Sequence, residues 1–179
     1  MSMTKGTYNV AHFAAQGGHL EVLKWLRFGS TYEEEEGVMA PLTYPADHAA
    51  CPWDEWTSAE AAAGGHLEVL KWARAHGCPW DENNGYTYGS DSDCFALAAA
   101  GGHLAVLRWL WDNDYPRHED DEDVPVHICA LAAEGGHLEV LKWLREHIFE
   151  WDARTGYEAT EAGHDDVLQW ALANGCPSD

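Results

Sequence analysis

The sequence predicts an all-α solenoid of five short helix-turn-helix units with three long inserted loops. The first observation is a phrase, GGHLEVLKW, that occurs unchanged at 17–25, 64–72 and 135–143, with variants at 101–109 and 162–170. The second is its spacing: the Gly-His glycines fall at 18, 65, 102, 136 and 163, and so are separated by 27 to 47 residues. Such periods are typical of stacked repeats whose single units cannot bury their apolar faces alone. The third observation is that each phrase follows a short Ala-rich segment.

Each Ala-rich segment is expected to form the first helix of a unit. The segments are 10–16, 58–63, 94–100, 128–134 and 155–161. Asn9 and Asp93 are suitable N-caps, and Thr57 with Glu60 and Thr155 with Glu158 fit the capping-box pattern. With the second helices added, the units span approximately 9–27, 56–75, 93–112, 127–146 and 154–173.

The repeated phrase itself is expected to form the second helix. Leu20, Leu23 and Leu26 recur on one face, and Glu21 can pair with Lys24 on the opposite face. The tryptophans at 25, 72, 109, 143 and 170 should form an apolar ladder along the stack, and the histidines at 19, 66, 103, 137 and 164 should fix each turn by hydrogen bonding to a neighbouring unit.

The pattern Ala-Ala, two residues, then Gly-His resembles the ankyrin repeat, whose common form ends its first helix in Ala-Ala and opens its second with Gly-His. The matching pairs are Ala14/Ala15, Ala61/Ala62, Ala98/Ala99 and Ala132/Ala133. Phrases such as CPWDEWT (51–57) resemble the Trp-rich, short-unit arrays of algae and large DNA viruses. The resemblance implies a protein-binding scaffold.

The composition restricts the partners. The chain carries 31 Asp and Glu against 10 Lys and Arg, a formal charge of −21. Such a surface does not suit nucleic acid or anionic membranes, and if charge selects a partner, that partner is basic. No secretory layout opens the chain, so we expect an intracellular, cytoplasmic protein with five reduced thiols.

Three insertions, at approximately 28–50, 83–92 and 112–126, separate one unit's second helix from the next unit's first. We expect all three to enter at the same point of the repeat and to form a row along one edge. They combine tyrosines with acidic runs, which suits a basic protein or peptide. The candidate partner-binding residues are Tyr32, Glu33, Glu34, Glu35, Glu36, Tyr44, Tyr86, Tyr88, Tyr115, Glu119, Asp120, Asp121, Glu122 and Asp123.

Two other functions compete with protein binding. The acidic loops could bind a divalent cation of the Ca²⁺ type, with His118 and His127 beside the third acidic run, but no calcium-loop framework is present. Alternatively, the chain is a structural spacer from a longer array, or its ends meet another copy end to end. Catalytic motifs and cofactor fingerprints do not occur, so we expect neither an enzyme nor a cofactor nor a specific metal site.

Overall fold

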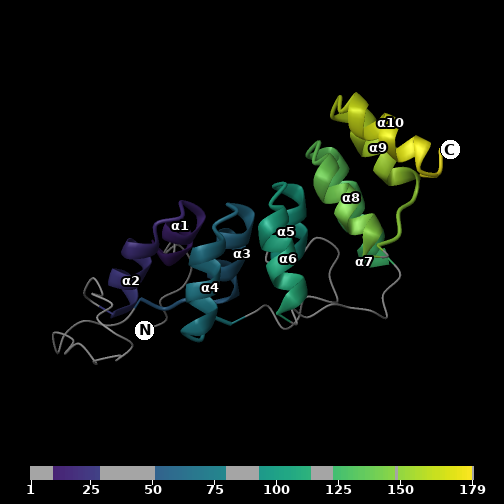
Figure 1. Ribbon diagram of the computed structural model, residues 1–179. Coiled ribbons are helices and arrows are strands. Elements are labelled where there is room, and N and C mark those ends of the chain that lie inside the picture. Colours follow the sequence, from purple (N-terminus) through teal and green to yellow (C-terminus); the bar gives the residue numbers. More distant parts are fainter. Residues whose placement is uncertain (1–9, 29–50, 80–92, 114–122, 148, 179) are drawn as a thin grey trace, which may run out of the picture.

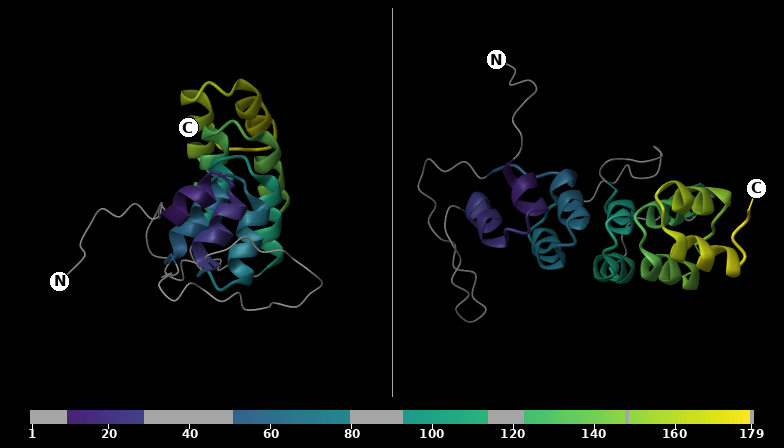
Figure 2. Two further views of the ribbon diagram at one scale, coloured as in Figure 1. Left: turned by 90° about the vertical axis from the view of Figure 1, so that its left-hand side faces the viewer. Right: turned by 90° about the horizontal axis from the view of Figure 1, so that it is seen from above.

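The computed structural model describes residues 10–28, 51–79, 93–113, 123–147 and 149–178, and in these ranges the regular secondary structure is ten α-helices. The helices follow one another in pairs along a curved array (Figure 1; Figure 2). The pairs are α1 (Val10–Gln16) with α2 (Leu20–Phe28), α3 (Glu55–Ala63) with α4 (Leu67–Ala75), α5 (Cys94–Ala100) with α6 (Leu104–Asp112), α7 (Asp123–Glu134) with α8 (Leu138–Glu146), and α9 (Ala153–Glu161) with α10 (Asp165–Ala173). The predicted all-α solenoid of five units is therefore confirmed.

The first helices pack side by side in chain order, from α1 against α3 to α7 against α9. Their shared surface consists of small residues, and Ala15, Ala62, Ala99 and Ala133 are completely buried there. Short side chains allow helix axes to approach closely, which explains why this segment is Ala-rich in every interior unit. In α9 the corresponding residue is Thr160, which is exposed.

The second helices supply the larger core residues. Leu23, Leu70, Leu107 and Leu141 are fully buried and belong to one continuous hydrophobic cluster. On the opposite face, Lys24, Lys71 and Lys142 donate to Glu21, Glu68 and Glu139 at 2.7–2.9 Å, as the three-residue spacing predicts. The apolar stripe fixes which face each helix buries. The three glutamates face solvent, whereas Lys24 is itself buried.

Each turn between the two helices of a unit contains a glycine, and in the first three units a histidine of the next unit makes a hydrogen bond to the end of the first helix. Gly102 has φ +76°, a left-handed conformation that glycine adopts without steric cost. The rings of His66, His103 and His137 make hydrogen bonds through Nε2 to the carbonyl oxygens of Gln16, Ala63 and Ala100 at 2.8–2.9 Å. At these three positions the predicted structural role of the repeated histidines is confirmed.

The predicted capping boxes were wrong in register. Helix α3 begins after Asp54 and α9 after Asp152, so Thr57 and Thr155 lie inside the first turn, where both are fully buried. Asp152 accepts from the backbone N–H of Arg154 at 2.8 Å. An aspartate three residues before the threonine is the better cap here because its short carboxylate reaches the free amides of the first turn. Asp93 caps α5 as predicted, whereas Asn9 lies outside the described residues.

The tryptophans form a ladder of a different kind from the one predicted. Trp72 packs edge-on against Trp53, and Trp170 against Trp151, with ring centroids 5.8 and 5.7 Å apart. Trp53 and Trp151 belong to the segments that precede α3 and α9. Trp72 and Trp170 thus contact an aromatic side chain from the segment that begins their own unit, and this contact ties the segment to the second helix. Trp143 instead packs edge-on against Trp111 of the preceding unit, with ring centroids 5.8 Å apart.

Candidate functional site

The predicted partner-binding residues lie outside the described residues, except for Asp123. Asp123 is the first residue of α7, which begins earlier than the predicted unit start at 127. The described helices fix only where the three insertions leave and re-enter the scaffold. Those entry points are the first part of the candidate site.

The first insertion is closed at its base by a backbone hydrogen bond. The N–H of Cys51 donates to the carbonyl of Leu26 at 3.0 Å. Cys78, Phe149 and Cys176 make the same bond to Ala73, Leu144 and Ala171 at 2.9–3.1 Å. Cys51 therefore resumes the turn that ends every second helix, and residues 29–50 are inserted within that turn.

The expectation that all insertions enter at the same point was wrong. The first insertion precedes the Cys-Pro dipeptide that begins at Cys51, whereas the extra residues of the second lie between Pro79 and Asp93, after the equivalent dipeptide. The helix ends that flank these segments nevertheless lie along one side of the array, opposite the glycine turns (Figure 1). The two insertions leave from the same edge but from successive positions on it.

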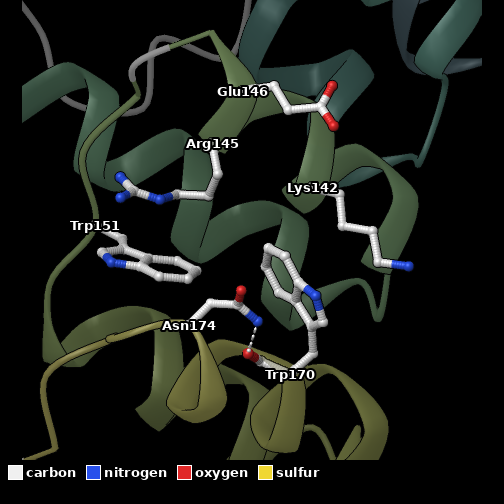
Figure 3. Close-up of a pocket in the computed structure, with 6 residues that line it drawn as sticks. All are labelled: Lys142, Arg145, Glu146, Trp151, Trp170 and Asn174. Carbon is white, nitrogen blue, oxygen red and sulfur yellow. Dashed lines mark hydrogen bonds between the residues drawn. The ribbon is translucent and has the colours of Figure 1, made fainter.

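The second part of the site is a pocket of about 470 Å³ between α8 and α10, which the sequence analysis did not identify. Its lining residues are Lys142, Arg145, Glu146, Trp151, Trp170 and Asn174. Figure 3 shows the two indoles on opposite sides of the opening, with the Arg145 side chain above Trp151. The pocket thus combines aromatic surface with cationic groups in a strongly acidic chain.

Arg145 holds one wall of the pocket in place. Its guanidinium lies 4.3 Å from the centroid of the Trp151 ring, and it donates a hydrogen bond to the carbonyl of Phe149. Both contacts join the end of α8 to the segment leading into α9. A guanidinium stacked on an indole is stabilised by the ring quadrupole, so this arginine acts as a positioning residue for Trp151.

The opposite wall is held by Asn174. Its side-chain Nδ2 donates to the carbonyl of Trp170 at 2.8 Å, drawn as the dashed line in Figure 3. The same carbonyl also accepts from the backbone N–H of Asn174 at 3.1 Å, so the Asn174 side chain is folded back onto the end of α10. The signal for this pocket in the sequence is a Trp-Asp pair before α9 together with an arginine two residues after Trp143, a combination that sequence analysis did not connect.

The buried cysteines contribute packing rather than chemistry. All five are free thiols, as predicted. Burial raises the pKa of Cys78 to about 11 and that of Cys129 to about 12, and it also raises the pKa of Cys176. The Cys78 and Cys176 thiols donate to the carbonyls of Asp54 and Asp152 at 3.4 and 3.3 Å. Protonated, buried thiols are poor nucleophiles and poor metal ligands.

Groups of three or more His, Cys, Asp or Glu side chains placed to hold a metal ion do not occur in the described ranges. His127 lies in α7, while His118 and residues 119–122 of the acidic run that follows it lie outside the described residues. Within the same described part of the chain, none of the helices combines the length and apolar character needed to cross a lipid bilayer.

The paired helices, the glycine turns and the inter-unit histidines define a helical repeat solenoid. Its fold is that of an ankyrin repeat array. The structure is similar to the crystal structure of the human ASB11 ankyrin repeat domain, with a TM-score of 0.58 and 21% sequence identity over 93% of this chain and 69% of that domain. The sequence matches no protein-family profile and no curated protein.

Proposed function

We propose that this chain is a protein-interaction module that binds a basic partner through the Tyr- and acid-rich insertions at one edge of the solenoid. The observation that carries the proposal is that the repeated residues and the variable residues have different roles in the fold. The repeated polar side chains, above all the histidines of the turns, are engaged in joining one unit to the next. Sequence that varies between units is concentrated in the insertions.

The ankyrin repeat fold supports this proposal because a rigid stack can present separated loops at fixed spacing. The two residues before Gly-His are Ala63-Gly64 and Ala100-Gly101 in two units, and in each of the other three units one of the two is Gly or Ala, so the surface beside the turns offers few large anchors. Tyrosines in the insertions would supply contact area with few rotamers to immobilise, and the carboxylates would pair with Arg or Lys. Net charge of −21 would accelerate encounter with a basic partner.

The chain itself supplies the design of the test. In α4 the dipeptide His76-Gly77 alone connects the helix end to Cys78, so replacing residues 29–50 by His-Gly should give the minimal connection to Cys51. Deleting 83–92 restores the shorter link seen before α3. The third acidic run is neutralised rather than removed, because Asp123 belongs to α7.

The intact chain and this trimmed chain are used to capture proteins from cell extract, after circular dichroism has confirmed that both fold. Captured proteins are then purified and titrated at two salt concentrations. We expect a basic protein that binds the intact chain only and loses affinity at high salt. Equal binding to both chains would contradict the loop proposal. If neither chain captures a protein and calcium raises the melting temperature of the intact chain alone, cation binding is favoured. If neither chain captures a protein and calcium has no such effect, the chain is a structural spacer.

A further inference from the structure

The pocket between α8 and α10 corresponds to a site between α2 and α4. The site between α2 and α4 is filled by a side chain of α2, whereas the pocket is open. Residues 17–27 and 135–145 have the same sequence, GGHLEVLKWLR. The next residue differs: it is Phe28 in α2 and Glu146 in α8. Two identical helices therefore end in an aromatic ring in one case and a carboxylate in the other.

Phe28 packs against the following unit. Its ring lies 5.8 Å from the Trp72 ring, edge-on at 89°, and 5.6 Å from the ring of His76. Trp72 and His76 occupy the positions that Trp170 and Asn174 occupy in α10. The tryptophan that receives a phenyl ring in the first junction thus has a counterpart in the last junction, where Trp170 lines the pocket beside the amide of Asn174 in place of an imidazole ring.

The arginine that ends the helix and the tryptophan before the next helix are arranged alike in both junctions. Arg27 lies 4.5 Å from the centroid of Trp53, just as Arg145 lies 4.3 Å from Trp151. Both arginines donate to the backbone carbonyl two residues before the tryptophan, Cys51 in one case and Phe149 in the other. Since this part of the framework is shared, the pocket lies where the ring of Phe28 lies in the first junction, and its volume of about 470 Å³ is ample for an aromatic ring.

Charge indicates what should accompany an aromatic ring in the pocket. Lys142 and Arg145 both line it, against the single carboxylate of Glu146. Lys142 is already paired with Glu139 at 2.7 Å, but that pair is solvent-exposed, and the ammonium has further N–H groups that can donate to a second carboxylate. A basic ligand would be repelled by two cations and attracted by one carboxylate. An acidic ligand would be attracted by the two cations and repelled by the one carboxylate.

We propose that the pocket between α8 and α10 binds an aromatic side chain of a partner peptide whose neighbouring residues are acidic. The ring would take the place that Phe28 takes in the first junction, against Trp170, and the carboxylates would pair with Lys142 and Arg145. The proposal goes beyond the insertions, because it uses a different surface and selects the opposite charge. The overall negative charge of the chain opposes an acidic peptide only weakly at physiological ionic strength, where the screening length is about 8 Å.

The test is a titration of the full chain, labelled with ¹⁵N at the Trp indoles, with three capped peptides: Gly-Phe-Glu-Glu-Gly, Gly-Phe-Gln-Gln-Gly and Gly-Ala-Glu-Glu-Gly. The indole N–H signals of Trp151 and Trp170 are assigned by single Trp→Phe variants. We expect the first peptide to shift both signals and to bind more tightly than either of the others. A peptide Gly-Phe-Lys-Lys-Gly should bind more weakly still.

Glu146→Phe is the decisive variant, because it gives α8 the sequence of α2 and fills the pocket from within. It should weaken binding of the Phe-Glu-Glu peptide at least about tenfold, the effect of excluding one buried aromatic side chain. Ala75→Phe is the matched control, since Ala75 is the exposed residue at the same position of α4. This control should leave binding unchanged.

Lys142→Gln tests the charge, with Lys71→Gln as its counterpart in α4. We expect a two- to fivefold loss from Lys142→Gln for the acidic peptide, about the strength of one exposed ion pair, and no change from Lys71→Gln. Unshifted Trp151 and Trp170 signals, equal binding after Glu146→Phe, or preference for the Lys-Lys peptide would each overturn the proposal. The peptide titration and the trimmed-loop capture read different surfaces, so failure of one leaves the other standing.

Discussion

The interior units and the last unit are built from the same phrase but differ in how completely a neighbour covers it. Gly102 lies directly beneath the ring of His137 from the next unit, whereas among the described residues nothing lies within 4 Å of a Cβ placed on Gly163. The position of the buried Ala96 and Ala130 is taken in α9 by Tyr157, which is 58% exposed. Equivalent positions of the repeat thus have different surroundings in the interior units and in the last unit, and therefore different energetic roles.

The largest expected effect comes from adding one methyl group to the two glycines of this comparison. Gly102 and Gly163 have nearly the same φ, +76° and +77°, so Ala costs about 1–2 kcal/mol of conformational strain at either position. At Gly102 the new Cβ would also lie 2.5 Å from Nδ1 of His137 and would displace that ring. We expect Gly102→Ala to lower the free energy of unfolding by about 3 kcal/mol or more, once the displaced hydrogen bond is included.

Urea denaturation followed by circular dichroism measures both variants. Gly163→Ala is the internal control, since it carries the strain without the clash. Equal losses for the two substitutions would mean that the stacked histidine does not constrain the interior turn.

Removing an interior histidine should have the next largest effect. His103 bonds to the Ala63 carbonyl at 2.8 Å, so His103→Ala leaves that carbonyl without its partner and opens space above Gly65. A loss of about 1–3 kcal/mol follows. His19, in the first unit, is exposed, and His19→Ala should change stability by less than about 0.5 kcal/mol. Comparable losses at the two positions, measured by thermal and urea unfolding, would argue against an inter-unit role.

The sequence predicted features that repeat locally. The helices, the Glu-Lys pairs and the histidine turns follow from a period or from a phrase found several times, and these predictions were confirmed. The caps were misplaced because Thr57 and Thr155 fit a local motif, while the true caps, Asp54 and Asp152, lie one turn earlier beside a tryptophan. That tryptophan packs on the second helix of the same unit, a contact that local patterns do not contain.

The pocket could not be predicted for a related reason. It depends on Glu146, which occupies in α8 the position of Phe28 in α2. It also depends on the contact between the rings of Trp151 and Trp170, both of which belong to the unit that follows α8. Taken alone, Glu146 is an ordinary exposed helix residue. Its effect appears only when two identical helices are compared together with the units that follow them. The candidate loop residues remain a prediction, since the described part of the chain does not include their side chains.

Alkaline pH should lower the free energy of unfolding through a buried thiol of an interior unit more than through one of the last unit, and this difference is smaller than those above. Burial raises the pKa of Cys78 from 9.0 to about 11, so the folded state keeps a proton that the unfolded chain loses. This contribution to stability is fully present below about pH 9 and is lost as pH rises toward 11. At pH 10 the loss is about 1 kcal/mol, the value of somewhat less than one pKa unit.

The measurement compares urea unfolding at pH 8 and pH 10 for the wild-type chain and Cys78→Ala, because tyrosines and lysines titrate in the same range in both. The wild type should lose more stability than the variant. Cys176, in the last unit, has its pKa raised by shallower burial, so Cys176→Ala should reduce the pH dependence less than Cys78→Ala does. The reverse order would mean that burial of the thiol does not control the dependence.

The smallest effect on stability, and the most informative about function, is expected from Glu146→Phe. If the last junction is a copy of the first with one side chain missing, the new ring should pack on Trp170 as Phe28 packs on Trp72. Partial burial of a phenyl ring should then raise the free energy of unfolding by about 1 kcal/mol. Phe28→Glu makes the opposite exchange and should lower it by a similar amount. A Glu146→Phe chain that is no more stable than wild type, with its Trp170 indole signal unmoved, would show that the two junctions share a sequence but not a shape. A stabilised chain would mean that the open pocket is maintained at a cost in stability, as expected of a surface whose occupant comes from another molecule.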